Sequence, residues 1–340
     1  MTRTGYKTAG LALAFGTILS GAAVAEEVNI YTTREPGLIQ PLLDAFKASS
    51  GITVNTVFLK DGLAERVATE GASSPADILM TVDAGNLIDL KEKGLTQPVS
   101  SKILEEAIPA QLRDDKGEWF ALSMRARVVY AAKDIDVTAL NYEDLSDPKW
   151  KGKICIRAGQ HPYNTALIAD YIAHYGVEKT EDWLTGVKAN LARKAAGGDR
   201  DGAKDIAGGI CDLAVANSYY VGLMRSGKGG EEQVNWGNSI NVILPTFKDG
   251  GTQVNISGAS LAKHAKNKDA AVKLLEYLIS DEAQKIYAEA NFEYPVKTGA
   301  PVDPIVKSFG ELKIDKTPLT EIVSYRKQAS ELVDKVGFDN

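Results

Sequence analysis

The stretch VNIYTTREPGLIQPLLDAFKASSGITVNTVF, residues 28–58, decides the fold class. Its two ends, Val28–Thr32 and Thr53–Phe58, are rich in β-branched residues and predict strands. Between them, apolar residues recur at helical spacing over residues 37–49. A strand, a helix and a second strand in this order indicate parallel strands covered by helices, and therefore an α/β fold.

The same alternation continues towards the C-terminus. The sequence predicts helices over 61–69, 86–93, 164–175, 180–191, 201–206, 220–226, 270–278, 281–289 and 319–336, and strands over 77–81, 124–132, 153–157, 212–216 and 242–245. A second α/β unit starts after the Asp147-Pro148 turn, and the chain returns to the first unit after Pro245. Such bilobal folds bind a ligand between their lobes and close on it, although periodicity alone leaves a two-domain enzyme equally open. We predict two α/β lobes joined by hinge strands, formed by residues 26–126 with 250–300 and by residues 127–249 with 301–340.

The N-terminus has the organisation of a cleavable signal peptide. Arg3 and Lys7 precede a mostly apolar run over residues 11–19, and Ala23-Val24-Ala25 has the small-x-small pattern of a cleavage site. We therefore predict a signal peptide over residues 1–25 and a periplasmic location. The apolar run is too short for a membrane anchor, and no later stretch is long and apolar enough to embed the chain in a membrane.

Charge and cysteine content narrow the function classes. With 45 acidic and 39 basic residues, and no basic tract, the chain is not expected to bind nucleic acid. No Gly-x-Ser-x-Gly or His-Glu-x-x-His motif is present, so we predict no enzyme and expect a monomeric binding protein. Cys155 and Cys211 form an even pair in an oxidising compartment, which predicts a disulfide worth about 4 kcal/mol in the chain-entropy treatment. Two isolated thiols without nearby histidines disfavour a cysteine metal site.

Tyrosines gather at the junctions where predicted strands lead into helices. In open α/β sheets, ligands lie beyond the carboxyl ends of strands, so these junctions are the places to look for a site. Tyr163 opens one helix, and Tyr219 and Tyr220 open another, for which Ser218 is a plausible N-cap. In a first helical turn both neighbouring tyrosines can line a cleft. Arg34 leaves the first strand in the same way.

Phenol chemistry indicates a candidate ligand for these tyrosines. A free phenol has a pKa of about 10, and a bound cation stabilises its ionised form. Phenolate is a hard anionic donor that ferric iron accepts. Zinc would favour cysteine and histidine, and calcium would favour clustered carboxylates, whereas this chain has three histidines and no EF-hand pattern. Three phenolates would neutralise Fe3+, and an anion balanced by Arg34 would fill the remaining positions. The alternative is that the tyrosine pair packs in the core or stacks on an organic ligand.

Several stretches spread over nearly all of the chain after residue 25 carry a family resemblance. They are Asn29–Arg34, Pro75–Gly85, Arg125–Val129, Trp150–Arg157, Gly198–Arg200, Ala216–Tyr220, Asn255–Ala259 and Phe292–Pro295. In these stretches the chain resembles the bacterial periplasmic ferric-ion-binding proteins. The resemblance implies a bilobal type II periplasmic binding protein whose Fe3+ ligands are Tyr163, Tyr219 and Tyr220. It also implies an ABC transporter permease in the inner membrane as the partner.

One departure from the family pattern affects the first lobe. Many members carry a His-Tyr or His-Glu ligand pair after the first strand, where this chain has Arg34-Glu35-Pro36. The chain therefore looks like the subgroup that uses three tyrosines and a synergistic anion, typically carbonate or bicarbonate, with Arg34 holding the anion. Glu35 remains open as a direct ligand.

The sequence does not decide the roles of three further residues. Arg125 and Arg127 project from one face of their strand, and the sequence does not say which faces the cleft. His161 lies in the Tyr163 loop as a ligand or a neighbour of the site. The rival function is a binding protein of the same fold for a small organic ligand, such as a phosphonate, a polyamine or thiamine.

Overall fold

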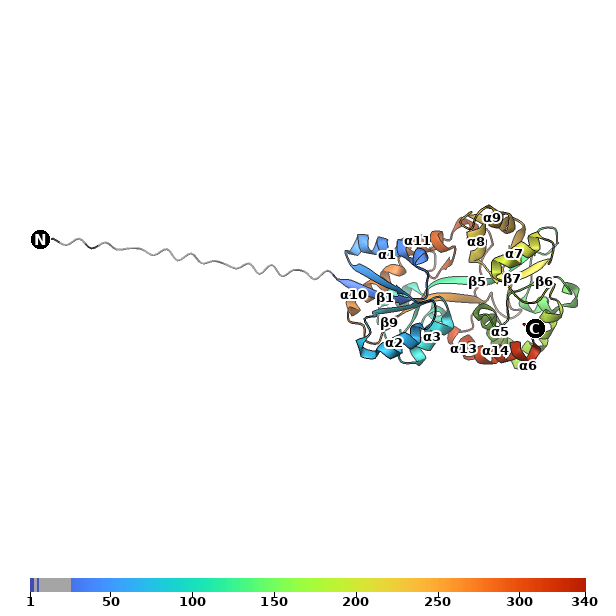
Figure 1. Ribbon diagram of the computed structural model, residues 1–340, viewed down its shortest axis with the longest axis horizontal. Coiled ribbons are helices and arrows are strands. Elements are labelled where there is room, and N and C mark those ends of the chain that lie inside the picture. The colour runs from blue at the N-terminus through green and yellow to red at the C-terminus, as the bar shows by residue number, and fades with distance from the viewer. Residues whose placement is uncertain (3–4, 6–25) are drawn as a thin grey trace.

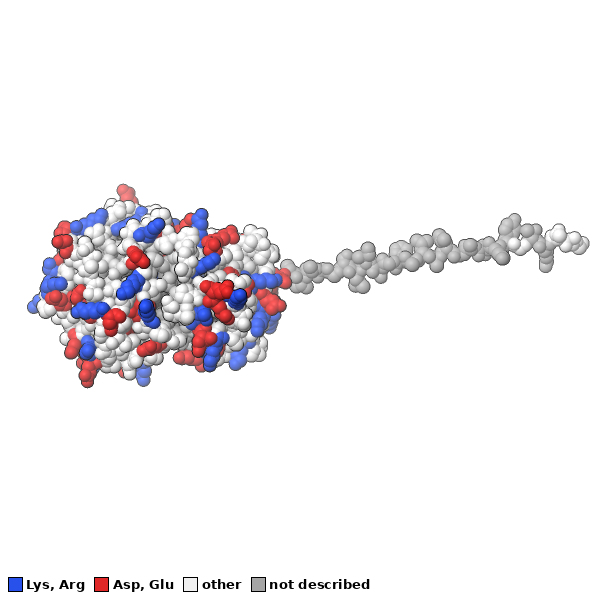
Figure 2. All heavy atoms as spheres, turned by 180° about the vertical axis from the view of Figure 1, so that it is seen from behind, with Lys and Arg blue, Asp and Glu red and all other residues white. Residues whose placement is uncertain are grey.

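The computed structural model describes residues 1, 2, 5 and 26–340. Figure 1 shows two α/β lobes side by side, with long strands crossing between them. The predicted cleavage site and most of the predicted signal peptide lie outside the described residues. Among the described residues, none of the helices is long and apolar enough to cross a membrane. Acidic and basic side chains are interspersed over the face seen in Figure 2.

Ten strands in the described part of the chain form one continuous sheet that bends from lobe to lobe. They are β1 (Glu27–Thr32), β2 (Thr53–Phe58), β3 (Ile78–Thr81), β4 (Thr96–Gln97), β5 (Phe120–Ala132), β6 (Ile154–Cys155), β7 (Leu213–Asn217), β8 (Ile240–Ile243), β9 (Val254–Ala262) and β10 (Tyr294–Pro295). The main order is β2-β1-β3-β9-β5-β7-β6. The predicted βαβ start is confirmed, because β1 pairs in parallel with both β2 and β3.

Strand β5 connects the two lobes. Its residues from Phe120 to Ala126 pair with β9, and its residues from Arg127 onward pair with β7 and β8. All thirteen residues of β5 are buried, as expected for a strand that runs through the centre of the molecule. The change of partner between residues 126 and 127 places neighbouring β5 residues beside different strands.

Helices surround both ends of the sheet. They are α1 (Pro36–Ser50), α2 (Leu63–Glu70), α3 (Ala84–Glu92), α4 (Lys102–Ala107), α5 (Pro162–Tyr175), α6 (Val177–Ala189), α7 (Asp199–Ala207), α8 (Tyr219–Arg225), α9 (Glu231–Asn238), α10 (Lys268–Leu278), α11 (Asp281–Asn291), α12 (Pro304–Lys307), α13 (Leu319–Ser324) and α14 (Arg326–Val336). Short 3-10 turns cover Gly71–Ser73, Ala110–Leu112, Tyr142–Ser146 and Pro148–Trp150. Helices α10 and α11 pack on α1, whereas α13 and α14 pack on α5 (Figure 1). The lobe boundaries given above stay a prediction.

Two sequence predictions differ from the structure. The helix predicted over residues 319–336 is divided into α13 and α14 at Tyr325. The guanidinium of Arg326, the first residue of α14, donates to Asp83 of the other lobe at 3.0 Å. The second helix therefore starts at the residue whose side chain contacts the other lobe. Residues Asn255–Ser257, for which no strand was predicted, are part of the nine-residue strand β9, which pairs with β5 in the centre of the sheet.

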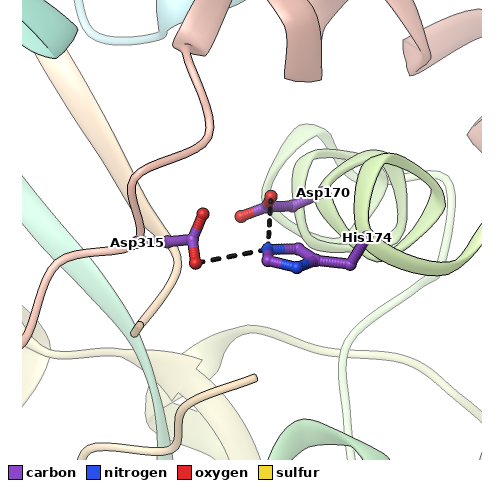
Figure 3. A group of neighbouring side chains, drawn as sticks. All are labelled: Asp170, His174 and Asp315. Atoms are coloured by element: carbon purple, nitrogen blue, oxygen red, sulfur yellow. Dashed lines mark ion pairs between the residues drawn. The ribbon is translucent and has the colours of Figure 1, made fainter. Parts of the chain in front are cut away.

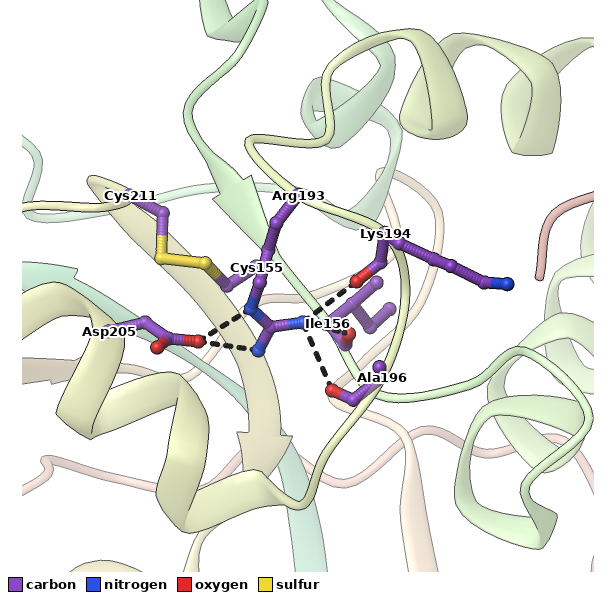
Figure 4. The surroundings of a disulfide bond; sticks show 7 residues. All are labelled: Cys155, Ile156, Arg193, Lys194, Ala196, Asp205 and Cys211. Carbon is purple, nitrogen blue, oxygen red and sulfur yellow. Dashed lines mark hydrogen bonds and ion pairs between the residues drawn. A yellow bond between two sulfur atoms is a disulfide. The ribbon is translucent and has the colours of Figure 1, made fainter. Parts of the chain in front are cut away.

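The predicted disulfide is confirmed. Cys155 at the end of β6 is bonded to Cys211, which lies just before β7, with 5.9 Å between the Cα atoms. Figure 4 shows Arg193 beside this bond, where its guanidinium is held by Asp205 and by the carbonyl groups of Lys194 and Ala196. Because β6 and β7 are parallel neighbours, the disulfide joins the two strands that lead to the candidate tyrosines.

Candidate metal centre

The structure brings the three predicted tyrosines together. Tyr163 is the second residue of α5, and Tyr219 and Tyr220 are the first two residues of α8. The hydroxyl oxygens of Tyr163 and Tyr219 lie 3.5 Å apart, and the rings of Tyr219 and Tyr220 have centroids 4.1 Å apart. This convergence follows from topology, since β6 and β7 are parallel and their carboxyl ends lie at one edge of the sheet.

The start of α8 is fixed differently from the sequence prediction. Ser218 was expected to cap the helix, but it has helical backbone angles and makes no cap bond. Its hydroxyl accepts instead from the backbone N–H of Ala126 at 3.1 Å, and its own N–H donates to the Ala126 carbonyl. The side chain thus continues the pairing of β5 with β7 beyond the strand end. The capping role was wrong, whereas the expected place of Tyr219 and Tyr220 in the first turn was right.

His161 serves as the N-cap of α5. Its Nδ1 accepts from the backbone N–H of Tyr163 at 3.2 Å, and its ring lies edge-on to the Tyr163 ring. Burial, reinforced by the charge of Arg157, lowers the pKa of His161 to about 4, so the imidazole is neutral at pH 7. Metal ligation through Nδ1 would require this cap to break.

Burial makes the phenols of Tyr219 and Tyr220 hard to ionise without a cation. Burial and then the neighbouring phenols of Tyr163 and Tyr220 raise the pKa of Tyr219 well above its usual value. Burial, Tyr163 and Asp199 raise the pKa of Tyr220 to about 12. Phenols this close together disfavour successive ionisation unless a cation of high charge lies between them. The group is therefore suited to a trivalent ion.

Guanidinium groups surround the phenols. Those of Arg125 and Arg157 lie 5.6 and 5.1 Å from the centre of the Tyr163 ring, and that of Arg200 lies 5.6 Å from the centre of the Tyr220 ring. These are cation–π distances. Their counter-charges differ: Arg157 pairs with Asp199, whereas neither Arg125 nor Arg200 forms an ion pair within residues 26–340. Arg125 is buried and donates to Ser257 and to the carbonyl of Val82.

Arg34 already has a counter-charge. Its guanidinium is buried and donates to both carboxylate oxygens of Glu293 at 3.0 Å, and also to Ser257. Burial alone would lower the pKa of Arg34, but the Glu293 carboxylate more than offsets this and raises it. Sequence reasoning missed Glu293 as a partner, although the stretch Phe292–Pro295 carried the family resemblance.

Arg127 positions the elements that carry the tyrosines. Its guanidinium donates to Asp199 of α7 at 2.8 Å, to Asn217 of β7 at 3.1 Å and to Asn164 of α5. Arg125, two residues earlier, borders the Tyr163 ring instead. Their different surroundings follow from the change of β5 partners between residues 126 and 127 and from strand twist. Of the pair, Arg125 is the one that reaches the phenols.

Glu35 is placed apart from these contacts. It is exposed at the start of α1, and its carboxylate makes no hydrogen bond with the described residues. Arg34, the residue before it, points inward to Glu293. Nothing in this arrangement favours Glu35 over the phenols as a metal ligand.

Two hinged α/β lobes with converging polar side chains at their strand ends define a type II periplasmic binding protein. The chain belongs to the family described as bacterial extracellular solute-binding protein, whose profile matches residues 73–312. It is 40% identical over 322 residues to "Iron uptake protein A2" of Synechocystis sp., covering 93% of this chain and 91% of that protein.

Solved structures show the same similarity. The chain matches "Bordetella ferric binding protein" with a TM-score of 0.90 and 64% identity, covering 93% of this chain and all of that one. A Trichodesmium protein solved in complex with iron and citrate matches with a TM-score of 0.86 and 42% identity, covering 92% of this chain and 99% of that one. The expected fold is thereby confirmed.

Proposed function

We propose that this protein captures Fe3+ in the periplasm with Tyr163, Tyr219 and Tyr220 and delivers it to an ABC permease in the inner membrane. The observation that carries the proposal is the convergence of three phenols at the adjacent carboxyl ends of β6 and β7. The similar proteins are named for iron uptake and for ferric binding, and these names support Fe3+ as the cargo.

The charges around the phenols support a synergistic anion. Three phenolates cancel the charge of Fe3+, while Arg125 beside them has no carboxylate partner among residues 26–340. A carbonate, bicarbonate or small carboxylate bound to the iron would supply that partner. A similar protein from Trichodesmium was solved in complex with iron and citrate, which supports the presence of an anion beside the metal. We assign the anion contact to Arg125 first and to Arg34 second, because Glu293 already balances Arg34.

The two lobes have separate roles in the proposed cycle. The phenols belong to α5 and α8 of the second lobe and bind Fe3+ first. Arg34 and Arg125 belong to the first lobe and the connecting strand, so the loaded site favours closure of one lobe on the other. Each phenol that binds must lose its proton, and iron loading therefore releases protons.

A visible titration tests this function. Ferric citrate or ferric nitrilotriacetate is added at neutral pH, with and without bicarbonate, and a phenolate-to-iron charge-transfer band is expected. The Tyr219→Phe/Tyr220→Phe variant should lose the band. The Tyr277→Phe variant is the matched control, because it removes a phenol on α10 whose hydroxyl has no hydrogen-bond partner in the described part of the chain. No band in either buffer would refute iron binding and favour an organic ligand that stacks on the tyrosines.

The same titration separates the two arginines. If Arg125 holds the anion, Arg125→Met should abolish the effect of bicarbonate on the band while the phenolates still bind iron weakly. Loss of the bicarbonate effect in Arg34→Met alone would instead assign the anion to Arg34.

A further inference from the structure

A second group of potential metal ligands lies at the other end of α5. Asp170 and His174 are one turn apart on this helix, and Asp315 faces them from the segment between α12 and α13 (Figure 3). The Nε2 atom of His174 lies 3.8 Å from an oxygen of Asp170 and 3.2 Å from an oxygen of Asp315. At 1.5 Å per residue, His174 is about 16 Å along the helix from Tyr163, so the two groups are separate.

Asp170 is the unusual member of this group. Its side chain is fully buried, and neither carboxylate oxygen has a hydrogen-bond partner within residues 26–340. No lysine or arginine of the described chain forms an ion pair with Asp170 or Asp315. Burial and then the charge of Asp315 raise the pKa of Asp170 well above its usual range. A buried carboxylate without a partner is costly, so this position calls for a proton or a cation.

His174 is oriented as a metal ligand would be. Its Nδ1 lies 3.0 Å from a carboxylate oxygen of Asp249, which also accepts from the hydroxyl of Tyr175 at 2.9 Å. Phe247 stacks on the imidazole with ring centroids 4.1 Å apart. A carboxylate on Nδ1 fixes the tautomer that presents the Nε2 lone pair, as in the usual support of metal-bound histidines. That lone pair faces the two other aspartates, with the hydroxyl of Thr317 at 3.3 Å.

We propose that Asp170, His174 and Asp315 bind a divalent transition-metal ion, with Zn2+ as the best match. One imidazole and two carboxylates form a donor set that zinc accepts, and their charge equals that of the ion. Bonds of about 2.1 Å in a tetrahedron place neighbouring ligand atoms about 3.4 Å apart, close to the two distances here. A pocket of about 410 Å³ borders His174 and Asp315, from which water reaches the fourth position.

The surrounding backbone is shaped to this group. Asp315 is held by the N–H groups of Gly251 at 2.7 Å and Thr317 at 2.8 Å. A Cβ on Gly250 would lie 2.2 Å from the Asp315 oxygen and 2.8 Å from the His174 ring, so only glycine lets the chain pass here. A metal ion would therefore join α5 to the segment that carries Asp315, which is distant in sequence, and its role is structural.

Zinc binding to the purified mature chain tests the proposal, with the phenols either free or loaded with Fe3+. Calorimetry and elemental analysis after dialysis should give one zinc per chain in both states. At free zinc about a hundred times the dissociation constant, Tm should rise by about 5 °C. The His174→Gln and Asp170→Asn variants should lose this zinc, and Asp249→Asn should bind it about 10 to 100 times more weakly. His264→Gln removes an exposed histidine from the first lobe and should behave as wild type.

Cobalt provides a readout that does not depend on the folding of a variant. Co2+ added to the unmodified protein should give the visible bands of a four-coordinate ion, and equimolar Zn2+ should remove them. Absence of retained zinc in the wild type would overturn the proposal. So would zinc binding that is equal in His174→Gln, Asp170→Asn and His264→Gln, because the metal would then bind elsewhere. Iron binding by the phenols is unaffected by either result.

Discussion

The Glu293→Gln substitution tests whether Arg34 is held as a buried ion pair. The two side chains are 6% and 2% exposed, and the guanidinium Nη2 lies 3.0 Å from the Glu293 carboxylate. Glutamine keeps the size and one oxygen acceptor of the side chain but removes its charge. Arg34 then stays buried without its counter-charge, with the glutamine oxygen and Ser257 as its remaining side-chain partners.

The expected loss of stability is large. Removal of one partner from a buried ion pair costs about 3 to 5 kcal/mol, and the retained oxygen places this variant at about 3 kcal/mol. With a shift of about 2 °C for each kcal/mol, the Tm of the iron-free protein should fall by about 6 °C. Urea unfolding should show the same loss of free energy with an unchanged m-value.

The control is Glu289→Gln, which removes an exposed carboxylate from α11, the helix that ends just before Glu293. It should change Tm by no more than about 1 °C. Bicarbonate should stabilise Glu293→Gln more than wild type, because Arg34 then has a free charge to offer to an anion. If the Tm of Glu293→Gln equals the Tm of Glu289→Gln, Arg34 does not depend on a buried counter-charge and the reasoning is refuted.

Four other results are expected. Iron affinity, measured in competition with citrate and corrected for citrate protonation, should fall at least about tenfold per pH unit from pH 7 to pH 5, since each bound phenol gives up a proton; a flat profile would exclude phenolate ligands. Iron-free protein should lose stability as the pH rises above about 10, because Tyr219 and Tyr220 ionise less readily when folded than when unfolded. Replacement of Cys155 and Cys211 by alanine should cost about 4 kcal/mol in urea unfolding, and an equal stability of the reduced wild type would confirm the disulfide as the cause. His161→Ala should cost about 1 kcal/mol through the lost cap yet keep the charge-transfer band, whereas loss of the band would make His161 a ligand.

The sequence was sufficient for those features that depend on strand order. Once β6 and β7 were read as strands, their following residues had to meet at one sheet edge, and Tyr163, Tyr219 and Tyr220 were found in this way. The Cys155–Cys211 pair followed from compartment and number. These predictions needed only local patterns and a general rule of α/β folds.

Partners across long sequence separations could not be predicted in the same way. Glu293 is 259 residues from Arg34, and no local pattern marks it as the carboxylate that neutralises this guanidinium. The different positions of Arg125 and Arg127 depend on the change of partner strands in the middle of β5, which period-two alternation does not reveal. The hydroxyl of Ser218 likewise accepts from Ala126 of the neighbouring strand β5, 92 residues away, instead of capping α8.

The charge of the ligands at each end of α5 indicates the charge of the metal ion expected there. Three phenolates around Fe3+ are neutral together, so the buried guanidinium of Arg125 still needs an anion, and iron binding should depend on one. The same phenolates around a divalent ion would keep one negative charge, which Arg125 itself would balance, and no anion would be required. Dependence on bicarbonate therefore reports the oxidation state of the bound iron as well as the residue that holds the anion. At the other end of the helix, Asp170 and Asp315 together would contribute two negative charges once both are ionised by a bound cation, so a divalent ion matches that group and a trivalent ion does not. Because an unbalanced charge in a buried site is costly, we expect the two groups to sort ions by charge.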